Sequence, residues 1–121
     1  MKKLLLTLCA VCFFFTACEK QSQAVSETEI DPGKIYFFFS DTCPHCHDAL
    51  RYIERKYPDL QYSMVNVANP AGYDLFVKCA RKFNLGRNIG TPLFCMGSNY
   101  LMGWAPEYEA RFDQYVKPFS R

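Results

Sequence analysis

The sequence predicts an α/β fold in which helices flank a four-stranded mixed sheet, with the element order β-α-β-α-β-β-α. Two observations lead to this prediction. Short runs rich in aromatic and β-branched residues alternate with longer segments whose apolar residues recur at helical spacing. The last two predicted strands are separated only by a short turn, which indicates a hairpin. With 121 residues, the chain is expected to form one domain.

The first predicted strand is the apolar, aromatic run 34–39, which is typical of a buried strand. A helix follows, with Cys43 at or near its first position. Its apolar residues recur at helical spacing over residues 48–57, and Pro58 ends this pattern. Residues 60–67 are rich in β-forming residues and predict a second strand. A helix that joins two such strands predicts a right-handed βαβ unit with parallel strands.

The remaining elements are predicted in the same way from turn residues and apolar spacing. They are a turn at 69–72, a helix at 73–83, a strand at 93–96, a turn at 97–99, a strand at 100–104 and a last helix opened by Pro106.

The N-terminus has the pattern of an export signal. Lys2 and Lys3 precede an apolar run of 12 residues, 4–15, which is too short for an ordinary membrane span. The polar residues that follow, up to Pro32-Gly33, are typical of a flexible tether. We therefore expect a signal peptide over 1–17, a tether over 18–33 and a folded domain over 34–121.

The end of the apolar run resembles the lipobox of bacterial lipoproteins. Ala17 is the small residue required before the cysteine, although Phe15 replaces the usual aliphatic residue. The resemblance implies that Cys18 is lipidated and holds the domain at the periplasmic side of a bacterial membrane. A plain secretory signal and an uncleaved anchor are the alternatives.

The charge balance gives no support to nucleic-acid binding. Without Lys2 and Lys3, the 12 remaining basic residues equal the 12 acidic ones. No nucleic-acid partner is therefore expected.

Cys43 and Cys46 lie where the first strand turns into the first helix. We expect Asp41 or Thr42 as the N-cap, with Pro44 tolerated in the first turn. The free N–H groups and partial positive charge of a helix N-terminus stabilise a thiolate on Cys43. Cys46 is one turn further on the same face, within reach to close a disulfide with Cys43.

His45 lies between the two cysteines, where its side chain can add hydrogen-bond donation or positive charge. A thiolate that forms at neutral pH is the attacking species in thiol–disulfide exchange. Tuning of the Cys43 thiolate is preferred here over the alternative that His45 is merely a surface residue.

At these residues the sequence resembles the thioredoxin superfamily, whose mark is a strand, a Cys-x-x-Cys that opens a helix, and a later cis-proline loop. The Pro44-His45 dipeptide matches the DsbA-like periplasmic thiol oxidases, and Thr91-Pro92 stands where the cis-proline loop is expected. The resemblance implies a cis Thr91-Pro92 bond beside the cysteines, with Thr91 backbone groups offered to an extended substrate.

The chain departs from the family pattern in two ways. Only 45 residues lie between Cys46 and Pro92, which leaves no room for the helical insertion of DsbA-like proteins. The body is therefore closer in size to a glutaredoxin or a small thioredoxin. Phe37 stands six residues before Cys43, where thioredoxins and DsbA-like oxidases place an acidic residue, so a proton acceptor for Cys46 is missing there.

These features predict a thiol–disulfide oxidoreductase that acts on cysteine-containing exported proteins and is reset by a redox partner. No metal or organic cofactor is expected, because the Cys43–Cys46 pair is itself the redox centre. A binding or chaperone module with the same fold is the first alternative. The motif also fits the c-type haem pattern Cys-x-x-Cys-His, with His47 as proximal ligand, and a zinc half-site.

Two further cysteines, Cys79 and Cys95, fall on the second helix and the third strand. An oxidising compartment permits a disulfide between them. The alternative, which we favour slightly, is that both are small buried hydrophobic residues.

Overall fold

A four-stranded sheet in the order β2-β1-β3-β4 forms the centre of the structure, a computed structural model that describes residues 29–120. Its strands are β1 (Ile35–Phe39), β2 (Ser63–Asn66), β3 (Leu93–Met96) and β4 (Asn99–Met102). β1 pairs with β2 in parallel, whereas the β1–β3 and β3–β4 pairs are antiparallel. The predicted four-stranded mixed sheet is confirmed.

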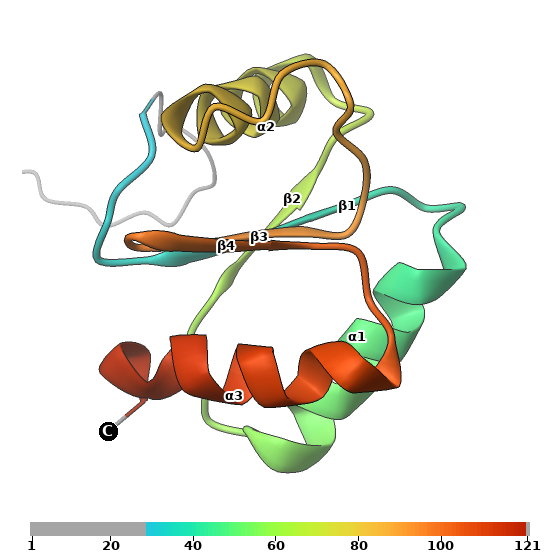
Figure 1. Cartoon of the computed structure of the whole chain (residues 1–121). Helices are drawn as coiled ribbons and strands as arrows, with labels where there is room; N and C mark the ends of the chain where they lie inside the picture. The colour runs from blue at the N-terminus through green and yellow to red at the C-terminus, as the bar shows by residue number, and fades with distance from the viewer. Residues whose placement is uncertain (1–28, 121) are drawn as a thin grey trace, which may run out of the picture.

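Helices cover both faces of this sheet. They are α1 (Pro44–Lys56), α2 (Pro70–Lys82) and α3 (Glu109–Val116), with short 3₁₀ helices at Pro106–Tyr108 and Lys117–Phe119 on either side of α3. Figure 1 shows α2 on one face of the sheet and α1 with α3 on the other. The chain order is therefore the predicted β-α-β-α-β-β-α.

The central strand β1 is apolar throughout because both of its faces are covered. Ile35 and Phe37 pack in the cluster between the sheet and helices α1 and α3. Tyr36 and Phe38 pack in the cluster between the sheet and α2. Alternate residues of a strand point to opposite faces, so a strand covered on both sides is a continuous hydrophobic run.

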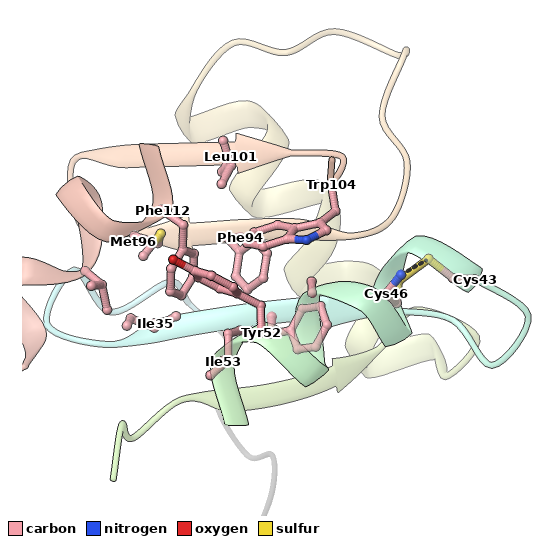
Figure 2. Packing of buried hydrophobic residues seen from close by; sticks show 13 residues of the cluster. Ile35, Cys43, Cys46, Tyr52, Ile53, Phe94, Met96, Leu101, Trp104 and Phe112 are labelled. Carbon is pink, nitrogen blue, oxygen red and sulfur yellow. Dashed lines mark hydrogen bonds between the residues drawn. A yellow bond between two sulfur atoms is a disulfide. The ribbon is translucent and has the colours of Figure 1, made fainter. Parts of the chain in front are cut away.

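The cluster on the α1 side is built around aromatic rings. Phe37 stacks on Phe94 with ring centroids 4.8 Å apart, and Phe112 meets Phe94 edge-on at 5.2 Å. Trp104 and Tyr52 complete this layer (Figure 2). Packed aromatic pairs of this kind each contribute about 0.5–1.5 kcal/mol to stability beyond the area they bury. The aromatic layer therefore forms a stable surface on which α1 packs.

The strand register decides what lies at the end of β1. Phe38 is paired with Leu93 in the antiparallel β1–β3 ladder. Residue 92 therefore lies at the end of the sheet where β1 finishes and the chain turns towards α1. In this way the topology brings Thr91-Pro92 and the Cys43–Cys46 segment to one end of the sheet.

Several predicted boundaries differ from the structure; the fourth strand, for example, spans Asn99–Met102 and not 100–104. The predicted strand 60–67 is shorter, and α2 begins at Pro70, inside the predicted turn 69–72. The helix starts early because Pro70 occupies its first turn, where the missing proline N–H removes no helical hydrogen bond.

Residues 29–33, the last part of the predicted tether, contact the domain. Ile30 packs against the cluster below α2, and the backbone N–H of Asp31 donates to the hydroxyl of Tyr36. The predicted signal peptide, Cys18 and the rest of the tether lie outside the described residues. Within residues 29–120, no helix is long and apolar enough to cross a membrane.

Gly72 allows α2 to lie against the end of β2, and its replacement tests this packing. A Cβ atom at position 72 would come 2.2 Å from the backbone oxygen of Asn66, so α2 would have to move. We expect Gly72→Ala to lower the free energy of unfolding by about 1–3 kcal/mol, because overpacking outweighs the better helix propensity of alanine.

The matched control is Gly90→Ala, since a Cβ atom at position 90 meets nothing within 4 Å. Urea unfolding of the two variants and the parent chain should show a loss for Gly72→Ala and a change within about 0.5 kcal/mol for Gly90→Ala. Equal stability of the two variants would contradict the close approach.

Candidate active site

The turn between β1 and α1 is held by hydrogen bonds to its neighbours. The N–H of Cys43 donates to the Ser40 carbonyl oxygen at 3.3 Å. The Asn66 side chain at the end of β2 donates to the Asp41 carboxylate at 3.5 Å. The start of α1 is therefore tied to the adjacent strand.

Cys43 is itself the N-cap of α1. Its backbone is extended, with φ −106° and ψ 100°, Pro44 is the first helical residue, and the Cys43 sulfur accepts the backbone N–H of Cys46 at 3.1 Å. The prediction of Asp41 or Thr42 as the N-cap was wrong. The N-cap position precedes Pro44 directly, since a residue before proline is disfavoured in helical backbone geometry.

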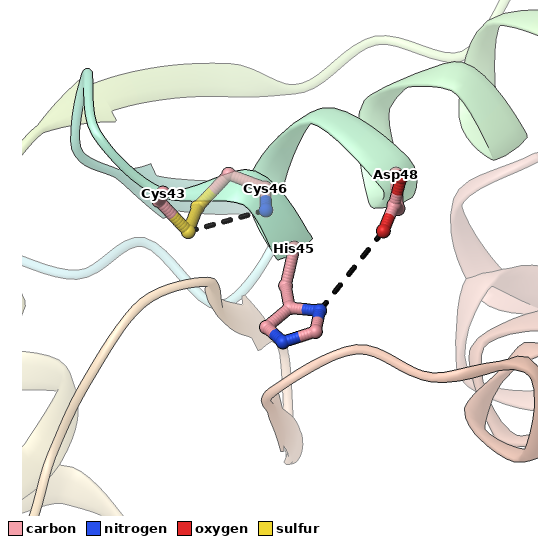
Figure 3. Close-up of a disulfide and its surroundings, with 4 residues drawn as sticks. All are labelled: Cys43, His45, Cys46 and Asp48. Atoms are coloured by element: carbon pink, nitrogen blue, oxygen red, sulfur yellow. Dashed lines mark hydrogen bonds and ion pairs between the residues drawn. A yellow bond between two sulfur atoms is a disulfide. The ribbon is translucent and has the colours of Figure 1, made fainter.

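Cys43 and Cys46 form a disulfide, with their Cα atoms 5.2 Å apart. Figure 3 shows the bond at the first turn of α1. The residues are 7% and 5% exposed and belong to the cluster on the α1 side of the sheet. The predicted reach between these cysteines is confirmed, and the disulfide rests on the aromatic layer described above.

His45 and His47 both lie exposed on α1. His45 Nδ1 is 4.0 Å from the Asp48 carboxylate (Figure 3). The same carboxylate also pairs with Arg51. Pro44 is exposed as well. The Pro-His dipeptide is thus presented to solvent beside the disulfide.

The Thr91-Pro92 peptide bond is cis, as the resemblance implied. Pro92 is fully buried, Thr91 is half-buried, and the Pro92 carbonyl oxygen accepts the N–H of Gly103 at 2.8 Å. By the β1–β3 register, this bond lies at the same end of the sheet as the turn that leads to Cys43.

Phe37 occupies the strand position at which the resemblance to thioredoxins predicts an acidic residue. It is fully buried and stacks on Phe94, and Tyr62 lies 6.3 Å away from it by ring centroids. A carboxylate there would be desolvated among aromatic rings, which costs several kcal/mol. Position 37 therefore supplies packing behind the cysteines and no titratable group.

A groove of about 280 Å³ opens beside the motif, and the sequence alone did not indicate it. One side consists of α1 residues on the face of His45, and the other is the segment between β4 and α3 with the first residue of α3. Its lining includes His45, Asp48, Arg51, Arg55, Trp104 and Glu109. The i, i+3 spacing of His45, Asp48 and Arg51 was the available sequence signal for this groove.

Behind the motif, α1 is fastened to α3 through Asp113. The carboxylate of Asp113 accepts hydrogen bonds from the hydroxyls of Tyr52 and Tyr57 at 2.7 and 2.6 Å and from Lys56 at 2.8 Å. Burial acts to raise the pKa of Asp113, but the donors outweigh it and lower that pKa. Burial and the same carboxylate raise the pKa of Tyr57 to about 12.

Within residues 29–120, no group of three or more histidine, cysteine or acidic side chains is placed to hold a metal ion. The c-type haem alternative rests on the Cys-x-x-Cys-His spacing that ends at His47. Neither alternative gains support from the geometry around Cys43 and Cys46.

Comparison with known proteins adds one finding. No protein-family model matches the chain, and no curated protein matches it in sequence. A solved structure does match, that of a buckwheat glutaredoxin in complex with glutathione. The TM-score is 0.50 at 14% identity, over 70% of this chain and 74% of the glutaredoxin chain.

The chain therefore has a thioredoxin-like fold, with the four-stranded mixed sheet and flanking helices of that class. Within this fold, Cys43 and Cys46 form a Cys-x-x-Cys pair at disulfide distance at the start of a helix. Fold and cysteine pair together support a thiol–disulfide redox role.

Replacement of Asp113 tests how firmly α1 is held. We expect Asp113→Asn to lower the free energy of unfolding at pH 7 by about 1–3 kcal/mol, because hydrogen bonds to a charged, partly buried group are lost. The pKa of Asp113 is lowered in the folded state, so this stabilisation is present above the unfolded pKa of about 3.9 and disappears as the pH falls through the folded pKa.

Urea unfolding between pH 2 and pH 8 checks this expectation. The difference between the parent chain and Asp113→Asn should shrink below about pH 4. Asp59→Asn, at an exposed position just after α1, is the control and should show little change at any pH. A difference that is the same at pH 2 and pH 7 would refute the role of the charge.

Proposed function

We propose that the chain is an exported, lipid-anchored thiol–disulfide oxidoreductase that acts on cysteines of exported proteins. The observation that carries this proposal is the Cys43–Cys46 disulfide at the N-terminus of α1, with the Cys43 sulfur in the N-cap position. The cis Thr91-Pro92 bond at the same sheet edge and the thioredoxin-like fold support it.

The reduced pair reacts in two steps. The Cys43 thiolate attacks one sulfur of a substrate disulfide, which forms a mixed disulfide and releases the other substrate sulfur as a thiolate. Cys46, after losing its proton, attacks the Cys43 sulfur. The Cys43–Cys46 bond forms, the substrate leaves as a dithiol, and two electrons have passed to the substrate. The same steps in reverse oxidise a substrate dithiol.

The N-cap geometry favours Cys43 as the attacking sulfur. The N–H of Cys46 already points at the Cys43 sulfur, and it would donate equally to a thiolate there. The helix N-terminus adds partial positive charge, which lowers the pKa of cysteines in such positions. Phe37 has no ionisable group, so the proton of Cys46 leaves by a route other than β1.

Two features beside the pair support a polypeptide substrate. The groove next to His45 carries charges of both signs, from Arg51 and Arg55 and from Asp48 and Glu109. The half-buried Thr91, next to the cis bond, offers backbone groups for strand-like pairing with an extended chain. Residues that flank a substrate cysteine would occupy these surfaces.

Export and anchoring rest on the N-terminal sequence. The charged start, the 12-residue apolar run and Cys18 would deliver the domain to the periplasmic side of a bacterial membrane. There a redox partner must return the cysteine pair to its starting state, because each turnover changes its oxidation state.

The first test is covalent trapping with Cys46→Ser. Without the resolving thiol, the mixed disulfide between Cys43 and a client should accumulate, visible as reductant-sensitive adducts on a non-reducing gel of the full chain and identified by mass spectrometry. Cys43→Ser is the matched control and should trap nothing. A plain binding or chaperone module would give no covalent adduct with Cys46→Ser, and that result would refute the exchange mechanism.

The second test measures the reduction potential of the pair in glutathione buffers. His45→Ala should make this potential more negative, by roughly 30 mV for each tenfold change in the equilibrium constant, because the side chain beside the Cys43 thiolate no longer stabilises the reduced form. His47→Ala removes the other exposed histidine of α1 and should leave the potential unchanged. Equal shifts in both variants would indicate a general charge effect instead.

A further inference from the structure

The domain contains a second pair of cysteines on the other side of the sheet. Cys79 lies on α2 and Cys95 on β3, and each is fully buried. Both belong to the cluster between α2 and the sheet, and both are free thiols in this structure. Figure 1 shows that α2 lies across the sheet from α1, which carries the Cys43–Cys46 pair.

The two thiols are direct neighbours. Cys79 and Cys95 share a side-chain hydrogen bond, which with burial raises the pKa of the Cys79 thiol. The Cys79 thiol is therefore held in its protonated, unreactive form while the domain is closed. Two sulfurs in hydrogen-bond contact need only a small approach to reach bonding distance.

We propose that Cys79 and Cys95 form a second, buried disulfide that ties α2 to β3. Each thiol gives up one proton and one electron, and a sulfur–sulfur bond forms. The oxidant is a disulfide, either a small one such as oxidised glutathione or the Cys43–Cys46 bond of a second molecule, which is reduced to two thiols. Within one molecule the two pairs lie on opposite faces of the sheet, so direct exchange between them does not occur.

The burial of both cysteines determines when the bond forms. Since neither thiol is exposed, an oxidant reaches them only during folding or while α2 is detached. Once formed, the disulfide resists reduction for the same reason. It is therefore a structural brace and not a second catalytic pair.

The brace would act on the segment that carries the cis bond. Residues 79–95 would become a closed loop that contains Thr91-Pro92, and Cys95 is only three residues beyond Pro92. A closed loop restricts the unfolded chain and stabilises the folded one. The bond would hold the cis-proline end of β3 against α2 without touching the exchanging cysteines.

Peptide mapping of the full chain tests the proposal. The chain is unfolded and reduced, refolded in a buffer of oxidised and reduced glutathione, and alkylated. Trypsin places Cys79 in peptide 79–81 and Cys95 in peptide 88–111. Mass spectrometry should find these two peptides joined by a disulfide. Recovery of both in alkylated form, or joined to other cysteines, would overturn the proposal.

A second measurement isolates the effect on stability. In Cys43→Ser/Cys46→Ser, the melting temperature should be roughly 10 °C higher after oxidative than after reductive refolding. Adding Cys95→Ala to that variant is the control and should abolish the difference. Equal melting temperatures in both buffers would refute the brace. Since both motif cysteines are replaced in these variants, the outcome of this melting experiment does not depend on the proposed exchange activity.

Discussion

The hydrogen bond from the Cys46 N–H to the Cys43 sulfur is the contact on which the site depends. It makes one residue both the cap of α1 and a member of the redox pair. The backbone must leave β1 and turn within three residues for this to happen, and the turn is tied to β2 through Asp41 and Asn66. Pro44 then starts the helix directly after Cys43, so the N–H of Cys46 in the first turn points at the Cys43 sulfur.

The core behind the pair explains the most unusual feature of the sequence. Phe37 replaces the acid expected on β1, and its ring stacks on Phe94 at the base of the aromatic layer. This layer supports α1 from below, while Asp113 and its three hydrogen-bond donors fasten the far end of the same helix to α3. α1 is thereby held against the sheet and against α3, although position 37 on β1 places no carboxylate behind the sulfurs.

The sequence predicted the parts of the molecule that local pattern determines. The apolar run of β1, the cysteines at the strand-to-helix turn and the β3–β4 hairpin each have a short-range signal, and all three are confirmed. The N-cap was misassigned because general N-cap preferences favour Asp41 or Thr42. Pro44, as the first helical residue, instead makes Cys43 the N-cap. The groove and the contacts of Asp113 join α1 to residues more than 45 positions away, and single-sequence patterns do not report such pairings.

The alternation along β3 relates the two cysteine pairs. Phe94 points into the layer that supports the Cys43–Cys46 disulfide, and its neighbour Cys95 points into the cluster below α2. Adjacent residues of one strand thus belong to two different cores, and the sheet separates them. Because Pro92 directly precedes this strand, a bond that fixes β3 from the α2 side also restrains the cis Thr91-Pro92 segment. Within one molecule the proposed brace and the proposed exchange site do not exchange disulfides directly, but both are connected to β3, a strand of four residues.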